Sequence, residues 1–115
     1  MTQDIPSIYG ATDMELTPAG QRAGADSGDP QISVKEISNT DGIAVGIWEC
    51  EPGGWPVNDR PDTEVATILG GSGKITDDNG TVTQIAAGTV VTLPKGWTGR
   101  WDITETTRKV YVIIK

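Results

Sequence analysis

Residues 87–99, with the sequence AGTVVTLPKGWTG, have the pattern of a short β-strand that ends in a tight turn. The β-branched run 89–93 stops at Pro94-Lys95-Gly96. Proline cannot donate to a strand ladder, and glycine allows the backbone geometry that a turn requires. A second segment, PGGWPVNDRPDTEVATILGGSG over residues 52–73, likewise ends a candidate strand in a glycine turn.

Outward from these segments, the chain is a series of short β-rich runs separated by Gly, Asn and Asp. Asp77-Asp78-Asn79-Gly80 is the strongest hairpin turn, because Asn-Gly tolerates positive φ. With no amphipathic helix between them, the runs predict an antiparallel β-sandwich or barrel. The candidate strands are 32–37, 43–51, 64–69, 74–76, 81–85, 89–93, 99–104 and 109–114.

The chain length of 115 residues fits a single domain. Residues 1–30 are rich in proline and glycine and contain few clustered apolar residues. We expect them to form an extended N-terminal arm, which lies along the barrel or a neighbouring subunit if it is ordered. Residues 31–115 are expected to form the β-barrel.

Charge and composition limit the possible partners. The net charge of −7 disfavours nucleic acid and an anionic membrane surface. The single cysteine and the absence of histidine exclude an intramolecular disulfide, a catalytic triad and a zinc site of the His/Cys type. The first residues, MTQDIPSIYG, do not resemble a signal peptide, and no stretch is apolar enough for a membrane span. We therefore expect a cytoplasmic protein.

The two quoted segments resemble the two halves of the cupin signature. Gly88, Pro94 and Gly96 have the spacing of the second half, and Glu64 with Gly71 matches the end of the first. Four phrases are similar to the subfamily of EutQ-like and ureidoglycine-aminohydrolase-like cupins. The resemblance implies an all-β double-stranded β-helix, or jelly-roll barrel. The four phrases are GIWECEPG at 46–53, ExxxILxG at 64–71, PKGWTGxW at 94–101 and RKxYV at 108–112.

The resemblance also indicates which metal ligands this chain lacks. The positions of the three family histidines fall on Asn58, Arg60 and Gly99, so that Glu64 alone remains of four potential ligands. The fixed charge of Arg60 would repel a cation. We therefore expect no metal and no cofactor.

The candidate ligand-binding residues are Asn58, Arg60, Asp62, Glu64, Trp101 and Tyr111. If residues 58–64 are extended, the first four of them share one face by period-two alternation. Arg60 has the fork geometry to clamp a carboxylate or phosphate, and a structural ion pair with Asp62 or Glu64 is equally consistent with the sequence.

The remaining candidates have alternative structural roles. Glu64 is also the candidate catalytic residue, as a general base. Trp101 could form a stacking wall, although core packing is favoured for it and for Trp97. Tyr111 could donate its hydroxyl group to a ligand, but a surface or core position is favoured for it and for Lys109.

These residues favour a small-molecule-binding cupin that takes a compact polar or anionic metabolite, with no settled catalytic role. A second hypothesis is a metal-assisted hydrolase or isomerase of small polar amides or amines, with the non-standard ligands Glu64, Asp62 and Asn58. A metal-free enzyme with Glu64 as base and a non-catalytic structural or interaction protein are further alternatives. The resemblance and the need to cover edge strands predict a homodimer.

Overall fold

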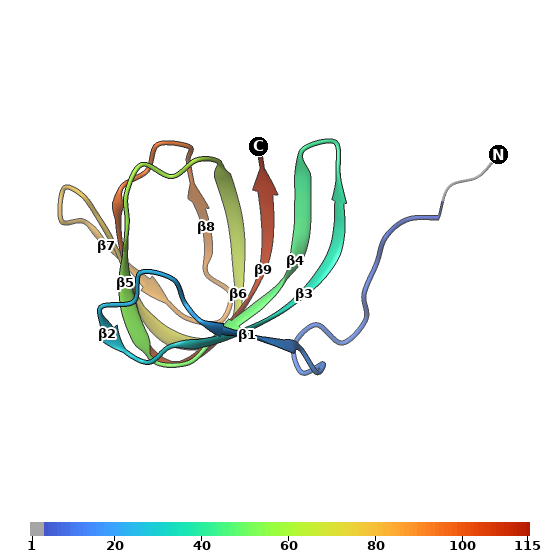
Figure 1. Ribbon diagram of the computed structural model, residues 1–115, viewed down its shortest axis with the longest axis horizontal. Helices are drawn as coiled ribbons and strands as arrows, with labels where there is room; N and C mark the ends of the chain where they lie inside the picture. The colour runs from blue at the N-terminus through green and yellow to red at the C-terminus, as the bar shows by residue number, and fades with distance from the viewer. Residues whose placement is uncertain (1–3) are drawn as a thin grey trace.

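The computed structural model describes residues 4–115, which form nine strands and no helix (Figure 1). No helix long and apolar enough to cross a membrane occurs in this part of the chain. In chain order the strands are β1 (Thr17–Gln21), β2 (Ser27–Gly28), β3 (Gln31–Thr40), β4 (Ile43–Cys50), β5 (Gly53–Val57), β6 (Thr63–Asp77), β7 (Val82–Ile85), β8 (Val90–Leu93) and β9 (Gly99–Ile114).

Two long antiparallel strands, β6 and β9, organise the molecule (Figure 1). They pair along their whole length, from Thr63 opposite Ile114 to Asp77 opposite Gly99. The first half of β6 and the second half of β9 belong to one sheet, together with β1, β3, β4 and β8. The other halves form a second sheet with β2, β5 and β7. The two sheets curl over a common interior, which confirms the predicted all-β jelly-roll fold.

The bend that separates the two sheets depends on glycine. The β6–β9 register shifts between Ile68 and Gly73, and Gly71 has a φ of +105°. A Cβ atom on Gly71 would lie 2.5 Å from the Thr106 carbonyl oxygen. The bend lets one continuous strand cross both sheets. This is why the runs predicted separately at 64–69 and 74–76 are both part of β6, and those at 99–104 and 109–114 part of β9.

The interior is filled by isoleucines and three indole rings. Trp55 and Trp101 stand opposite each other on β5 and β9, with ring planes 8° apart and centroids 6.1 Å apart. Trp48, on β4 in the other sheet, meets both rings edge to face. Aromatic pairs with these geometries add to the stabilisation that burial provides. The three indoles join the two sheets and form the floor of the cavity described below.

The sheets begin earlier than the predicted boundary at residue 31. Within the expected arm, β1 pairs with β3 and β2 pairs with β5. Asp26 accepts two hydrogen bonds from Arg100, and Arg108 donates to the carbonyl groups of Ala11 and Met14. Composition alone did not reveal these strands, because β2 has only two residues and β1 contains proline and glycine. Of the described residues, 4–10 extend away from the barrel (Figure 1).

Candidate functional site

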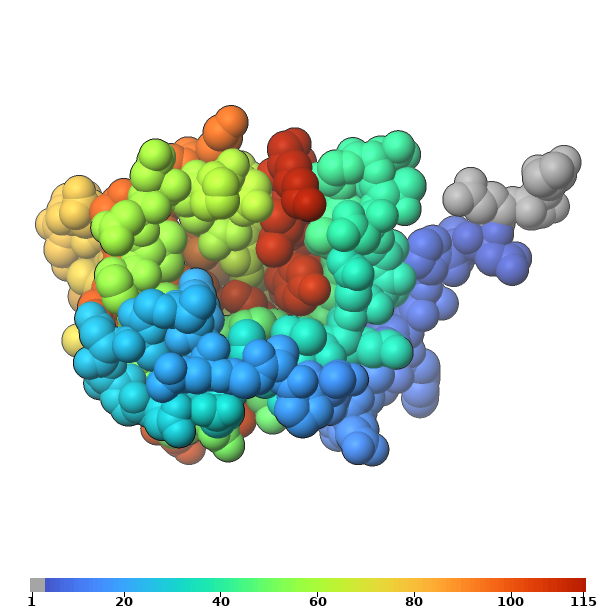
Figure 2. All heavy atoms as spheres, in the orientation of Figure 1, coloured from blue at the N-terminus to red at the C-terminus, as the bar shows by residue number. Residues whose placement is uncertain are grey.

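A cavity of about 300 Å³ opens between the two sheets. Its mouth lies between β5, β9 and the segment that connects β1 with β2, where Figure 2 shows a hollow in the surface. The floor consists of the three indole rings of Trp48, Trp55 and Trp101. The polar side chains that line the cavity are those of Arg22, Arg60, Glu64, Lys109 and Tyr111.

Glu64 lies at the centre of the polar group and is 4% exposed. Strand alternation on β6 turns Glu64, Ala66 and Ile68 inward, and all three are buried. The Oε1 atom of Glu64 is 3.2 Å from Arg60 Nη1, and its Oε2 atom is 2.6 Å from Lys109 Nζ. Within the described residues, no donor meets the angular criteria for a hydrogen bond to Oε2. The contact with Lys109 is therefore described as an ion pair. Both oxygens of this carboxylate therefore face cations.

Arg60 lies in the loop between β5 and β6, and Asp62 of the same loop holds its guanidinium on the side away from Glu64. Its Nη2 donates to Asp62 Oδ1 at 2.8 Å, and its Nε donates to the Asp62 carbonyl oxygen at 3.1 Å. Its backbone is also fixed, because its amide donates to the carbonyl of Trp97 and its carbonyl accepts from the amide of Gly96. Arg60 thus presents its guanidinium to the cavity in one fixed orientation.

Lys109 reaches the cavity from β9, where it pairs in register with Trp48 on β4 and Ile68 on β6. Its Nζ lies 4.2 Å from the ring centroid of Trp48 and 4.5 Å from that of Trp101. Lys109 is only 7% exposed. Burial lowers the pKa of its ammonium group, and the attraction of Glu64 opposes that shift only in part.

Arg22 closes the mouth from the segment after β1. Its guanidinium lies 5.1 Å from the ring centroid of Trp55, and burial lowers its pKa. No carboxylate lies within 4 Å of this guanidinium in residues 4–115, whereas Arg60 and Lys109 both have one. Three cations and one carboxylate thus line a cavity in a chain whose net charge is −7.

Two further groups near the cavity have raised pKa values. Burial raises the pKa of Tyr111, which faces Gly46 across the β4–β9 ladder and could not keep its position beside a larger residue. Burial also raises the pKa of the Cys50 thiol to about 11. Cys50 is fully buried and protonated near neutral pH, so it is unsuited to be a nucleophile.

The structure brings four of the six predicted ligand-binding residues to the cavity: Arg60, Glu64, Trp101 and Tyr111. The shared face predicted for residues 58–64 is wrong, because β5 ends at Val57 and Asp59 has a φ of +49°. Asn58 lines a separate hollow with Thr76 and Arg100. Asp62 contacts Arg60 from the loop and does not line the cavity.

Sequence reasoning gave too little weight to Lys109 and missed Arg22. The signal for Lys109 was available, because period-two alternation places it on the same face as Tyr111. Nothing in the sequence pointed to Arg22, since its position depends on how β1 and the following segment return across the mouth of the cavity. Trp48 and Trp55 also line the cavity, where they form its floor together with Trp101.

The residues at the expected metal position do not fit a divalent cation. Both oxygens of Glu64 already face Arg60 and Lys109, and Asn58 points to another hollow. The space beside Gly99 is filled by the indole of Trp97. Residues 4–115 contain no group of three His, Cys, Asp or Glu side chains arranged for metal binding. Glu64, Asp62 and Asn58 therefore do not form the ligand set of the second hypothesis.

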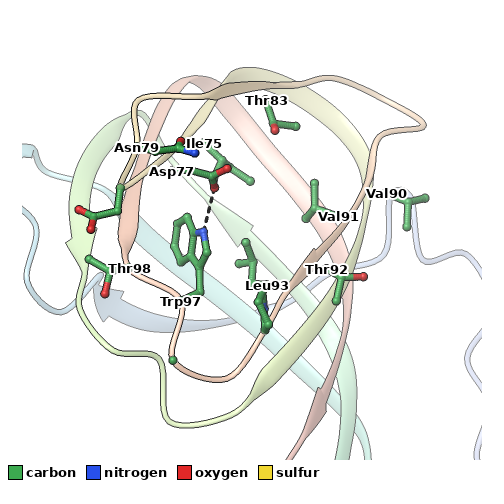
Figure 3. A pocket seen from close by; sticks show the side chains of 13 residues that line it. Ile75, Asp77, Asn79, Thr83, Val90, Val91, Thr92, Leu93, Trp97 and Thr98 are labelled. Carbon is green, nitrogen blue, oxygen red and sulfur yellow. Dashed lines mark hydrogen bonds between the residues drawn. The ribbon is translucent and has the colours of Figure 1, made fainter.

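A larger hollow of about 870 Å³ lies between β8 and the hairpin of β6 and β7 (Figure 3). Its walls include Val91 and Leu93, and Trp97 there donates a hydrogen bond to Asp77 at 2.9 Å. Its lining contains no cation, and its only ionisable groups are two aspartates. We take the smaller cavity as the candidate site, because the ionisable groups with complementary charges converge there.

Comparison with known proteins agrees with this architecture. The family model of the EutQ-like cupin domain matches residues 37–111, which is more than half of the chain. No protein with curated annotation matches the sequence. The chain belongs to the EutQ-like cupin domain family.

Solved structures show the same fold at low sequence identity. The Clostridium difficile EutQ protein is 18% identical, with a TM-score of 0.65 over 77% of this chain and 75% of that one. A DUF861-family protein of unknown function from Pseudomonas syringae is 20% identical, with a TM-score of 0.80 over 89% of this chain and 45% of its own length. The polyketide cyclase RemF from Streptomyces resistomycificus is 18% identical, with a TM-score of 0.68 over 96% of this chain and 80% of that one.

Proposed function

We propose that this cupin binds a compact organic anion, such as a small carboxylate, in the cavity between its sheets. The observation that carries the proposal is the excess of cations in the lining: Arg22, Arg60 and Lys109 line the cavity, and Glu64 is the single carboxylate among the lining residues. Such a cavity attracts anions even though the molecule as a whole is acidic. The low dielectric constant of the cavity wall strengthens the interaction of an anion with the nearby cations relative to more distant charges.

Arg22 is the residue that supports anion capture most directly. Its guanidinium lies at the mouth without a carboxylate partner in the described residues, and a ligand carboxylate would supply one. Below it, the stacked rings of Trp55 and Trp101 offer a flat apolar surface for the remainder of the ligand. The cavity volume of about 300 Å³ is at the small end of the range for ligand pockets and favours a compact molecule.

Isothermal titration calorimetry with small carboxylates tests the proposal. Benzoate and benzamide form a matched pair that differs in charge, and benzoate is expected to bind more tightly. Arg22→Gln should weaken benzoate binding by about tenfold to a hundredfold, the range for losing a hydrogen bond to a charged group.

Arg108→Gln is the matched control. Arg108 carries the same charge, but its guanidinium faces Glu49 outside the cavity, so this variant should keep the affinity of the unmodified protein. The proposal fails if no carboxylate binds, if benzamide binds as well as benzoate, or if the two arginine variants lose affinity equally.

A further inference from the structure

Lys109 is an unusual wall residue. Lysine is almost never fully buried, and here the amino group lies over two indole rings at the bottom of an anion-attracting cavity. A methionine or leucine at position 109 could fill the same volume without the cost of burying a charge. The amino group therefore suggests a chemical role beyond packing.

The surroundings of Lys109 provide what a nucleophilic amine requires. Burial lowers its pKa, which increases the fraction of the neutral form. The Glu64 carboxylate is 2.6 Å from the amino group and can accept its proton. Arg60, on the other oxygen of Glu64, keeps that carboxylate in place. The remaining charged group at the cavity, Arg22, stands at the mouth, where it would hold an acid group of a substrate.

We propose that Lys109 forms a Schiff base with a small oxo acid, a molecule that carries both a carboxylate and an aldehyde or ketone group. The carboxylate binds at Arg22 and Arg60, and the carbonyl carbon then lies toward Lys109. This inference rests on the proposed anion-binding function and deepens it, since it names the substrate class of the same cavity.

The reaction is balanced without an additional reactant. Glu64 takes a proton from the Lys109 ammonium, and the free electron pair of the amine forms a bond to the carbonyl carbon. The nitrogen, which becomes positively charged as this bond forms, passes one of its protons to the carbonyl oxygen, which becomes the hydroxyl group of a carbinolamine. Glu64 returns its proton to that hydroxyl group, which leaves as water while the carbon–nitrogen double bond forms. One ammonium group and one carbonyl group thus give one protonated imine and one water, and Glu64 is again a carboxylate.

Borohydride trapping of the full chain tests the proposal, with pyruvate as the probe. Borohydride delivers hydride to the imine carbon and fixes the adduct as a secondary amine. Intact-mass spectrometry is expected to show one adduct per chain, with the mass of pyruvic acid less one oxygen atom. Peptide mapping is expected to place it on Lys109 and not on the exposed Lys74 or Lys95. The Lys109→Met variant should lose the adduct, and Lys95→Met should keep it.

Lactate separates failure of this proposal from failure of anion binding, because it has the carboxylate of pyruvate and no carbonyl group. Lactate binding without a borohydride adduct from pyruvate overturns the Schiff base and leaves the proposed function standing. An adduct spread over the exposed lysines also overturns it. If neither molecule binds and no adduct forms, both proposals fail. Peptide mapping uses the unmodified protein, so the test holds even if Lys109→Met does not fold.

Discussion

Replacement of Glu64 by glutamine is expected to lower the free energy of unfolding by about 3–5 kcal/mol, the usual cost of removing one partner of a buried ion pair. The substitution keeps the shape of the side chain but leaves the buried Lys109 without a carboxylate partner and Arg60 with Asp62 alone. Urea denaturation followed by tryptophan fluorescence measures the effect, since the indoles of Trp48 and Trp101 lie next to Lys109.

The loss should depend on pH in a defined direction. Lys109 has a lowered pKa in the folded protein, so its contribution to stability is present above the ordinary value of 10.5 and is lost as pH falls through the folded value. Without Glu64 to attract the ammonium, the folded pKa falls further. The variant should therefore recover part of its stability as the pH is raised, over a wider range than the unmodified protein.

Glu49→Gln is the matched control for this experiment. Glu49 also pairs with an arginine, Arg108, but its side chain is 34% exposed. Pairs of this kind contribute about 0–1 kcal/mol. A double variant, Glu64→Gln with Lys109→Met, should be more stable than Glu64→Gln alone, because it removes a cation that has lost its partner. Equal losses of unfolding free energy for Glu64→Gln and Glu49→Gln would show that the buried ion pairs of Glu64 stabilise the fold no more than an exposed pair does.

The second large effect is expected at the bend between the sheets. Gly71→Ala should lower the free energy of unfolding by about 2–5 kcal/mol, from the strain of a positive φ and from overpacking. The new Cβ atom would lie 2.5 Å from the Thr106 carbonyl oxygen, which is backbone of the paired strand β9. Because that oxygen cannot move without disturbing the β6–β9 ladder, the clash cannot be relieved by a side-chain rotation.

Gly70→Ala separates this effect from a general cost of removing glycine. Gly70 is the preceding residue, and a Cβ atom there would meet nothing within 4 Å. The change should alter stability by less than about 1 kcal/mol, because alanine fits without a clash. Thermal denaturation of both variants measures the difference. Similar melting temperatures for the two would contradict the role assigned to Gly71.

Local patterns were sufficient to predict an antiparallel β-sandwich or barrel, and the resemblance to the cupin signature specified the jelly-roll fold. The Pro94-Lys95-Gly96 turn, the Asn79-Gly80 turn and the alternating strands are each set by neighbouring residues, and the structure contains them. The sequence left two roles open for Arg60, and the structure shows the ion pairs, with Glu64 at 3.2 Å and with Asp62 at 2.8 Å. The contact with Glu64 needed only the short loop before β6 to bring Arg60 beside the inward face of the strand.

Alternation places Lys109 on one face with Tyr111, but which face lines the cavity depends on long-range pairing, which periodicity does not encode. Lys109 belongs to the site because β9 pairs with β4 and β6 at one particular register. Arg22 belongs to it because the segment after β1 passes over the mouth of the cavity. The expected position of Asn58 was wrong for the opposite reason: the regular alternation assumed for it stops at the end of β5.

The most direct test of the anion-binding cavity is a crystal structure of the protein soaked with 4-bromobenzoate, whose bromine can be located by anomalous scattering. We expect the carboxylate within about 3 Å of the Arg22 guanidinium, the usual length of a charge-assisted hydrogen bond. The bromine should lie inside the cavity, beside the indoles of Trp55 and Trp101. Bromine density only in the hollow beside β8 or on the outer surface, with the Arg22 side empty, would contradict the account.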